Sequence, residues 1–212
     1  REVVRAAPPT PPTQRSLSAI TWNLHAETEG FPLMRHSVFF SKDYPAEFDD
    51  IFVRKRLPRE PTVYICAQDR GARLDPSESP PPNGPERLLV LVNAPATGDT
   101  HPFDRQEIEQ CEACTFDLLQ RCGLRVARSP ENMQVTTPAQ FERLFPATGG
   151  ALYGRASHGW QASFSRPGAR SKVPGLYLAG GSTHPGAGVP MAALSGRQAA
   201  ASLLSDLVST KR

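Results

Sequence analysis

Several features that define other classes of protein are missing from this chain. No segment approaches the roughly 20 apolar residues that a membrane-spanning helix needs. The first 16 residues are polar and rich in proline, so they hold no apolar core of a signal peptide. Cysteine is scarce, with four residues in 212 and one closely spaced pair, which argues against a zinc site or a disulfide framework. We therefore expect a cytoplasmic globular protein without a structural metal.

The charge balance is only slightly basic. A net charge of +3 and a pI near 8.8 give little reason to expect a nucleic-acid partner. The one local cluster joins Arg54, Lys55 and Arg56 with Arg59, shortly after the apolar residues 51–53. This pattern suits either a solvated surface turn or a contact with a membrane surface, and the sequence leaves both open.

Two groups of residues that resemble reactive or metal sites have simpler explanations. Cys111 and Cys114 form a C-x-x-C pair, but they lie inside a helical pattern, so buried cysteines explain them better than a redox or zinc site. Glu47, Asp49 and Asp50 lack the second acidic cluster that a magnesium–diphosphate site would need. We interpret these three acids as a solvated helix face.

The hydrophobic spacing predicts strands and helices in one mixed fold. Residues 62–67 and 87–93 are typical of strands, and the second is a near-continuous apolar run suited to a buried sheet position. A helix is expected over residues 104–121, followed by a short strand at residues 124–127.

Another helix is expected to begin after Thr137. The hydroxyl of Thr137 can cap it, and Pro138 suits its first position because the missing N–H costs nothing there. On this helix Phe141, Leu144 and Phe145 are expected to face inward.

The last part of the chain has the most distinctive pattern. Residues 176–179 form a short apolar run that predicts a buried strand, and Gly180 and Gly181 end it. Glycine lacks a Cβ, so another group can approach the main chain there. Turn-forming residues follow, and Pro190 suits the first turn of a helix whose N–H groups could stabilise electron-rich oxygens. Small residues at 192, 196, 199 and 200 would let that helix lie close to a sheet.

This string closely resembles the C-terminal flavin motif of the carotenoid desaturase family, the phytoene-desaturase-like branch of the flavin amine oxidases. The resemblance rests on GLYLAGG at residues 175–181 and THPGAGVPM at residues 183–191, followed by Ser195 and Gly196. The wording is most like the hydroxycarotenoid 3,4-desaturases, also called methoxyneurosporene dehydrogenases, of purple photosynthetic bacteria. Further likeness extends over most of residues 16–206.

The resemblance implies an α/β (mixed α+β) fold that forms the C-terminal half of a two-domain flavin amine oxidase. Residues 1–16 would be a flexible proline-rich segment, residues 17–150 a portion of the substrate-binding domain, and residues 151–212 the final strand, loop and helix of the FAD-binding domain. Such enzymes hold the flavin pyrophosphate on a G-x-G-x-x-G turn, which this chain lacks. Because the chain also begins with Arg1, we expect a C-terminal fragment, inactive alone, of a polypeptide whose Rossmann portion precedes it.

The implied activity is FAD-dependent formation of a C=C bond in an acyclic, 1-hydroxylated carotenoid, with hydride transfer to the flavin, in an enzyme peripheral to the inner membrane. Because the flavin supplies the chemistry, no catalytic base is assigned. Tyr153, His158 and Trp160 would line the substrate end, although core aromatics and a structural histidine would explain them equally. The cofactor-binding residues implied by the resemblance are Gly180, Gly181, Ser182, Thr183, Gly188, Val189, Pro190 and Met191.

Two alternatives stay open. One is a phytoene desaturase or another polyene oxidoreductase or isomerase of the same family. The other is a non-catalytic module that binds apolar ligands without flavin.

Overall fold

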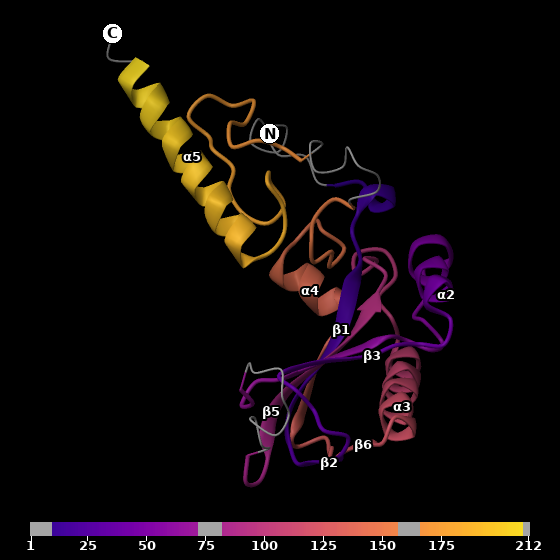
Figure 1. The fold of residues 1–212 in the computed structure, drawn as a ribbon. Helices are drawn as coiled ribbons and strands as arrows, with labels where there is room; N and C mark the ends of the chain where they lie inside the picture. The colour runs from indigo at the N-terminus through magenta and orange to yellow at the C-terminus, as the bar shows by residue number, and fades with distance from the viewer. Residues whose placement is uncertain (1–9, 72–81, 157–165, 210–212) are drawn as a thin grey trace. The chain divides into compact units, whose positions relative to one another are not determined.

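The computed structural model describes residues 10–71, 82–156 and 166–209, and these form two compact units. The first unit, residues 17–150, is called the sheet unit below. The second, called the loop–helix unit, contains the described residues before 17 and after 150. The mixed α/β class predicted from the sequence is confirmed (Figure 1).

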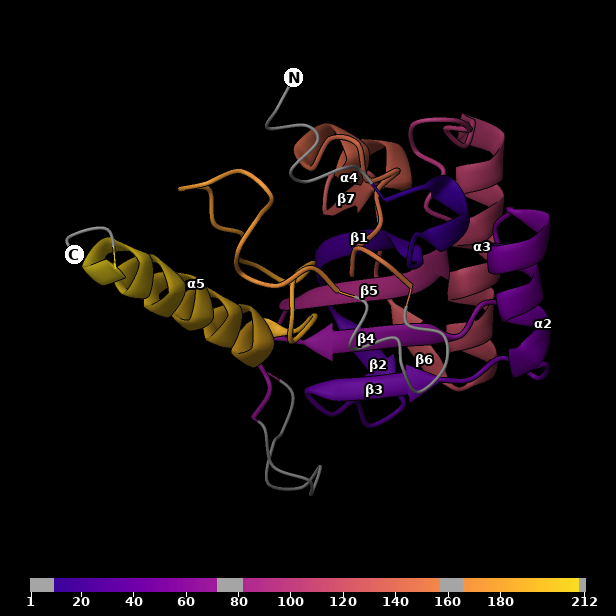
Figure 2. The same ribbon diagram turned by 90° about the horizontal axis from the view of Figure 1, so that it is seen from above.

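The sheet unit is built on a five-stranded antiparallel sheet (Figure 2). A separate antiparallel pair joins β2 (Thr28–Gly30) to β6 (Leu124–Val126). The strands predicted at residues 62–67, 87–93 and 124–127 are confirmed, with ends shifted by one residue. The order across the large sheet is β3 (His36–Phe39), β4 (Val63–Ala67), β5 (Glu86–Ala94), β1 (Ser18–Ala26) and β7 (Met133–Thr136).

Helix ends in the sheet unit follow the capping chemistry in the sequence. Helix α3 (Arg105–Arg121) starts at Asp104, whose Oδ1 accepts the N–H of Glu107 at 2.8 Å while Glu107 Oε2 accepts the N–H of Asp104 at 2.9 Å. This reciprocal capping box satisfies two donors of the first turn. Helix α4 (Pro138–Leu144) begins after Thr137 with proline at its first position, as predicted.

One face of the sheet forms the hydrophobic core with α3. Side chains alternate along the strands, so that Ile20, Trp22 and Leu24 of β1 are buried beside Leu88 and Val90 of β5. The indole of Trp22 meets the ring of Phe116 from α3 edge to face, with centroids 5.9 Å apart. Alternate positions of β4 and β5 are buried, which directs half of the side chains in each predicted strand into this core.

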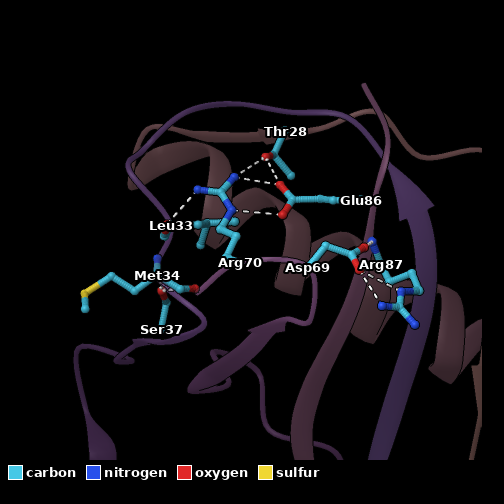
Figure 3. A network of polar contacts seen from close by, with 8 residues as sticks. All are labelled: Thr28, Leu33, Met34, Ser37, Asp69, Arg70, Glu86 and Arg87. Carbon is cyan, nitrogen blue, oxygen red and sulfur yellow. Dashed lines mark hydrogen bonds and ion pairs between the residues drawn. The ribbon is translucent and has the colours of Figure 1, made fainter. Parts of the chain in front are cut away.

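A buried ion pair ties the loop after β4 to the start of β5 (Figure 3). Arg70 donates to both carboxylate oxygens of Glu86, at 2.9 Å and 2.6 Å, and also to Thr28 Oγ1 and the carbonyl of Leu33. Burial alone would raise the pKa of Glu86, but hydrogen bonds from Arg70 and Thr28 outweigh it and hold that pKa below its usual value. Loss of either partner would leave a buried charge uncompensated.

The prediction of a solvated acidic helix face is wrong for two of its three members. Helix α2 (Tyr44–Phe48) runs directly into the π-helical turn η2 (Asp49–Arg54), and both Glu47 and Asp50 are buried while Asp49 is exposed. Glu47 accepts the N–H of Thr62 at 2.9 Å and the Nδ2 of Asn93 at 2.9 Å. An acid with such partners can be buried, and the partners of Glu47 are distant in sequence, so local spacing does not reveal them.

The inward orientation expected on α4 is also wrong in part. Leu144 and Phe145 are 66% and 63% exposed, and Phe141 is half-buried. The helix ends at Leu144, because the Glu142 carboxylate accepts the N–H groups of residues 147–149 and fixes a tight turn there. The side chains of the last helical positions therefore project from the end of the element rather than along its inner face.

The loop–helix unit has little regular structure before α5 (Val189–Ser209). Residues 176–179, predicted as a buried strand, contain only an isolated bridge between Tyr177 and Arg170, and Ala179 is exposed. A strand needs a ladder of neighbours, and among the described residues of this unit the segment has only this bridge. Consistent with that, residues 192, 196 and 199 of α5 are half-buried and residue 200 is exposed.

The proline-rich segment, expected to be flexible, makes defined contacts over residues 12–16. A short 3₁₀ helix, η1, spans Pro12–Gln14. Arg15 and Ser16 are buried, and the N–H of Ser16 donates to the carbonyl of Gly154 at 2.8 Å. This end of the segment is therefore an ordered part of the loop–helix unit.

Candidate functional site

The candidate site is the glycine-rich loop at residues 180–188 and the first turn of α5 that follows it. Its shape is fixed by two hydroxyl groups: Thr183 Oγ1 donates to the carbonyl of Gly180 at 2.8 Å and is hydrogen-bonded to Ser195 Oγ. Ser195 Oγ in turn accepts the N–H of Gly180 at 3.2 Å. Thr183 and Ser195 are both buried, so the hydroxyl of Thr183 shapes the loop from inside.

Three glycines leave open space on the loop. Gly180 and Gly188 have φ angles of +124° and +105°, which side chains rarely adopt, and a Cβ on either would meet no atom within 4 Å. At Gly181 the nearest neighbour of such a Cβ would be Ala187 Cα, at 3.7 Å. A flat molecule could therefore approach this main chain without meeting side chains.

The remaining predicted cofactor residues border that space. Ser182 is exposed on the loop, and Val189, Pro190 and Met191 are exposed at the start of α5. The helix begins at Val189, which puts Pro190 within the first turn as predicted. The N–H groups of this turn carry the positive end of the dipole of a 21-residue helix, which favours electron-rich oxygens.

Arg166 is a residue of the site that sequence reasoning missed. Its guanidinium donates to the carbonyls of Tyr153 at 3.1 Å, Gly181 at 2.9 Å and Arg155 at 3.3 Å. One side chain thus joins the loop to the segment at residues 153–155. Main-chain carbonyl acceptors leave no pattern in a sequence, so no local signal could have found this role.

Near Arg166, the main chain at Gly154 passes close to Ser182. A Cβ on Gly154 would lie 2.6 Å from Ser182 Oγ, so only glycine fits there. The N–H of Tyr153 donates to Ser16 Oγ at 3.0 Å, which adds the N-terminal segment to the site.

Of the three predicted substrate residues, Tyr153 is described and the other two are not. Tyr153 is 47% exposed, and His158 and Trp160 lie outside the described residues. Tyr153 borders a hollow of about 360 Å³ whose other lining residues are Ser16, Arg155, Arg166, Pro185, Gly186 and Ala187. The structure therefore brings Tyr153 to the glycine-rich loop.

The cysteine pair has no geometry for redox chemistry. Cys111 is buried in α3, and burial raises the pKa of its thiol to about 12, which removes the reactive thiolate at neutral pH. Cys114 is half-buried, and all four cysteines are free thiols. Within the described ranges, no group of three or more metal-ligating side chains converges, and no helix has the length and apolar character to cross a bilayer.

Comparison with known proteins gives a consistent result. The model of the family "Flavin containing amine oxidoreductase" matches residues 45–204. A hydroxyneurosporene desaturase of Rubrivivax gelatinosus is 57% identical over 98% of this chain and 39% of its own length. A hydroxyneurosporene desaturase of Cereibacter sphaeroides is 46% identical over 93% of the chain and 38% of its own length. A 1-hydroxycarotenoid 3,4-desaturase of a Flavobacterium is 33% identical over 92% of the chain and 39% of its own length. The chain thus spans about two fifths of these relatives.

Proposed function

Because this chain belongs to the family of flavin-containing amine oxidoreductases, we propose that it serves an FAD-dependent desaturase that introduces a C=C bond into an acyclic, 1-hydroxylated carotenoid. The observation that carries this proposal is the open, glycine-lined loop that leads into the first turn of α5. The names of the relatives support the carotenoid substrate.

In this proposal the backbone of Gly180, Gly181 and Gly188 supports FAD, with Ser182 exposed beside it. The first-turn N–H groups of α5 face an electron-rich edge of the isoalloxazine, next to Val189, Pro190 and Met191. Thr183 acts indirectly, since its buried hydroxyl holds the loop in the required shape. The residues present fit the cofactor because a planar group would fill space that no side chain occupies.

We assign the sheet unit to substrate binding through the sheet face opposite the core. Paired positions place Val38, Tyr64, Leu91 and Thr21 in one row across four strands, a width of about 15 Å. Val38 is 49% exposed, Tyr64 and Leu91 are half-buried, and Thr21 at the end of the row is buried, so the open part of the face lies over β3, β4 and β5. A slender apolar polyene needs such a smooth wall more than it needs polar partners.

The protein's own task in the reaction is to position the substrate and keep water out. FAD, when bound, supplies the acceptor for the hydride that leaves one carbon of the polyene, while a proton leaves the neighbouring carbon. The open sheet face would hold the polyene in one orientation. In the loop–helix unit, Tyr153 would be the described residue that contacts substrate. Arg166 would keep the loop rigid, which lowers the entropy lost when the reacting groups meet.

A matched pair of glycine variants tests the cofactor site in the full-length gene product. Gly181→Val should lower FAD affinity about tenfold to hundredfold, because the side chain fills space needed by the cofactor. Gly168→Val, whose site is equally open and lies in the same unit, should leave affinity unchanged. Flavin content after purification and fluorescence titration measure the effect. Full FAD binding by Gly181→Val would refute the assignment.

The substrate is tested separately by product analysis. The flavin-loaded gene product should desaturate 1-hydroxylated acyclic carotenoids and leave phytoene unchanged. The reverse preference would favour a phytoene desaturase, and binding of carotenoid without any flavin would favour a non-catalytic binding module.

A further inference from the structure

The sheet unit carries an exposed aromatic surface that the proposed site does not use. Four rings follow one another from the end of β3 through η2, at Phe40, Tyr44, Phe48 and Phe52. Their centroids are 5.6, 5.0 and 6.3 Å apart in succession, so the rings support one another. Phe40 is 64% exposed, and the neighbouring Val53 is 73% exposed.

The inner side of the same segment fixes its orientation. Ile51 is buried, and Glu47 is bound to the N–H of Thr62 and to Asn93 of β5. These contacts hold α2 and η2 against the sheet unit. Phe40 and Tyr44 of this aromatic stripe are therefore presented outward, while Phe48 and Phe52 are half-buried beside them.

Positive charge borders the stripe. Lys42, Arg54, Lys55 and Arg59 are exposed around it, and the exposed acids of the same segment are Asp43 and Asp49. The third acid nearby, Asp50, is buried and bound by Arg54 at 2.7 Å and by Arg56 at 3.0 Å. Lys55 Nζ lies 5.9 Å from the centre of the Phe52 ring, so its charge sits at the edge of the aromatic surface.

We propose that this surface, residues 40–59 with its aromatic stripe and basic border, docks the protein on an anionic lipid bilayer. Aromatic side chains insert at the boundary between headgroups and acyl chains, while lysine and arginine extend to the phosphates. A partner protein would satisfy the apolar stripe equally, but the basic border is complementary to anionic headgroups. The proposal deepens the proposed function, since a substrate dissolved in lipid would be taken up there.

The test is binding of the purified protein to vesicles of phosphatidylcholine with or without phosphatidylglycerol, measured by flotation without flavin or carotenoid. Phe40→Ser with Val53→Ser should lower the partition coefficient about tenfold or more. Lys42→Gln with Lys55→Gln should lower it about twenty-five-fold on anionic vesicles, at about fivefold per charge, and hardly at all on neutral ones.

Helix α4 offers a matched control. Leu144→Ser with Phe145→Ser removes side chains of equal exposure, and Arg143→Gln removes an exposed charge beside them. Both controls should bind like the wild type, and circular dichroism with thermal melting checks that every variant folds.

Three results would overturn the proposal. They are unchanged lipid binding by the folded Phe40→Ser, Val53→Ser variant, an equal loss in the α4 controls, or a dimer in sedimentation that this variant dissociates. Because the assay contains neither flavin nor carotenoid, a failure of the desaturase proposal would leave the lipid result unaffected, and the reverse also holds.

Discussion

Each of the two units of this protein is stabilised internally by a different kind of interaction. Every buried hydrophobic side chain among the described residues lies in the sheet unit, where strands and α3 share one core. In the loop–helix unit the buried side chains are polar: Arg15, Ser16, Thr183 and Ser195. The first unit is stabilised by apolar burial, and the second by hydrogen bonds that shape a loop.

This difference predicts where ligands change stability. A hydrophobic core is complete without a ligand, whereas a loop with open glycine positions gains contacts only when another molecule fills the space. Ligand binding stabilises the state that binds, so FAD should protect the loop–helix unit far more than the sheet unit.

The largest expected effect is at the centre of the core. Trp22 is fully buried against Phe116, so Trp22→Ala should cost about 3–5 kcal/mol of unfolding free energy through the cavity it leaves. Urea denaturation measures this cost. Phe145→Ala, at a 63% exposed position, is the control and should change stability by less than about 0.5 kcal/mol. Similar costs for both would contradict the view of one dominant core.

The second prediction concerns the buried ion pair. Glu86→Gln leaves Arg70 without its counter-charge and should cost about 3 kcal/mol, whereas Glu109→Gln breaks an exposed pair with Arg105 and should cost under about 1 kcal/mol. The pKa of Glu86 is lower in the folded state than in the unfolded state. Its stabilisation is therefore present above the unfolded pKa of about 4.3 and is lost as pH falls through the folded value.

Denaturation at a series of pH values tests that sign. Wild-type stability should fall on acidification below about pH 4.3, and Glu86→Gln should show a shallower fall. An equal slope in both proteins would mean that Glu86 does not contribute to acid sensitivity.

A third prediction isolates the loop–helix unit. Arg166→Ala removes hydrogen bonds to three carbonyls, so amides of residues 180–188 should exchange with deuterium about tenfold faster, as expected for a loss of about 1–2 kcal/mol. Exchange in β1 and β5 should stay unchanged. Arg87→Ala, which removes an exposed ion pair with Asp69, is the control and should not affect the loop. Uniform acceleration of exchange across both units would contradict a role of Arg166 that is local to the loop.

The smallest effect is expected at the surface of α5. Asp206 accepts the hydroxyl of Tyr177 at 2.7 Å and pairs with Arg170 at 2.9 Å, and the first of these contacts raises the pKa of Tyr177. Asp206→Asn should leave the free energy of unfolding nearly unchanged, because exposed ion pairs contribute little. It should also lower the pKa of Tyr177 toward its usual value, which an ultraviolet titration of tyrosinate detects. An unchanged titration would show that the hydrogen bond is absent in solution.

The contrast between the apolar core of the sheet unit and the hydrogen-bonded loop also explains which elements could be predicted from the sequence. The apolar runs of β4 and β5, the hydrophobic spacing of α3, and Thr137 followed by Pro138 at the start of α4 are local patterns with a physical cause, so those elements were found within a residue. The strand predicted at residues 176–179 was wrong, because strand formation depends on a neighbouring strand that local hydrophobicity does not specify. The burial of Glu47 was missed because its partners, Thr62 and Asn93, are distant in sequence. Asp50 was missed although its partners, Arg54 and Arg56, are close in sequence. Arg166 was missed because it binds carbonyl groups. The motif at residues 180–191 was recognisable from its amino-acid sequence. That the buried hydroxyl of Thr183 shapes the loop from inside became clear only from the structure.

Lys55 ends the helical segment α2–η2 with φ of 55° and ψ of 41°, the left-handed conformation that glycine adopts most easily. A residue with a Cβ costs about 1 kcal/mol or more there. Glycine would relieve that cost and remove the positive charge beside Phe52. Lys55→Gly should therefore raise thermal stability while it weakens the proposed lipid contact, so one residue couples the two properties with opposite signs.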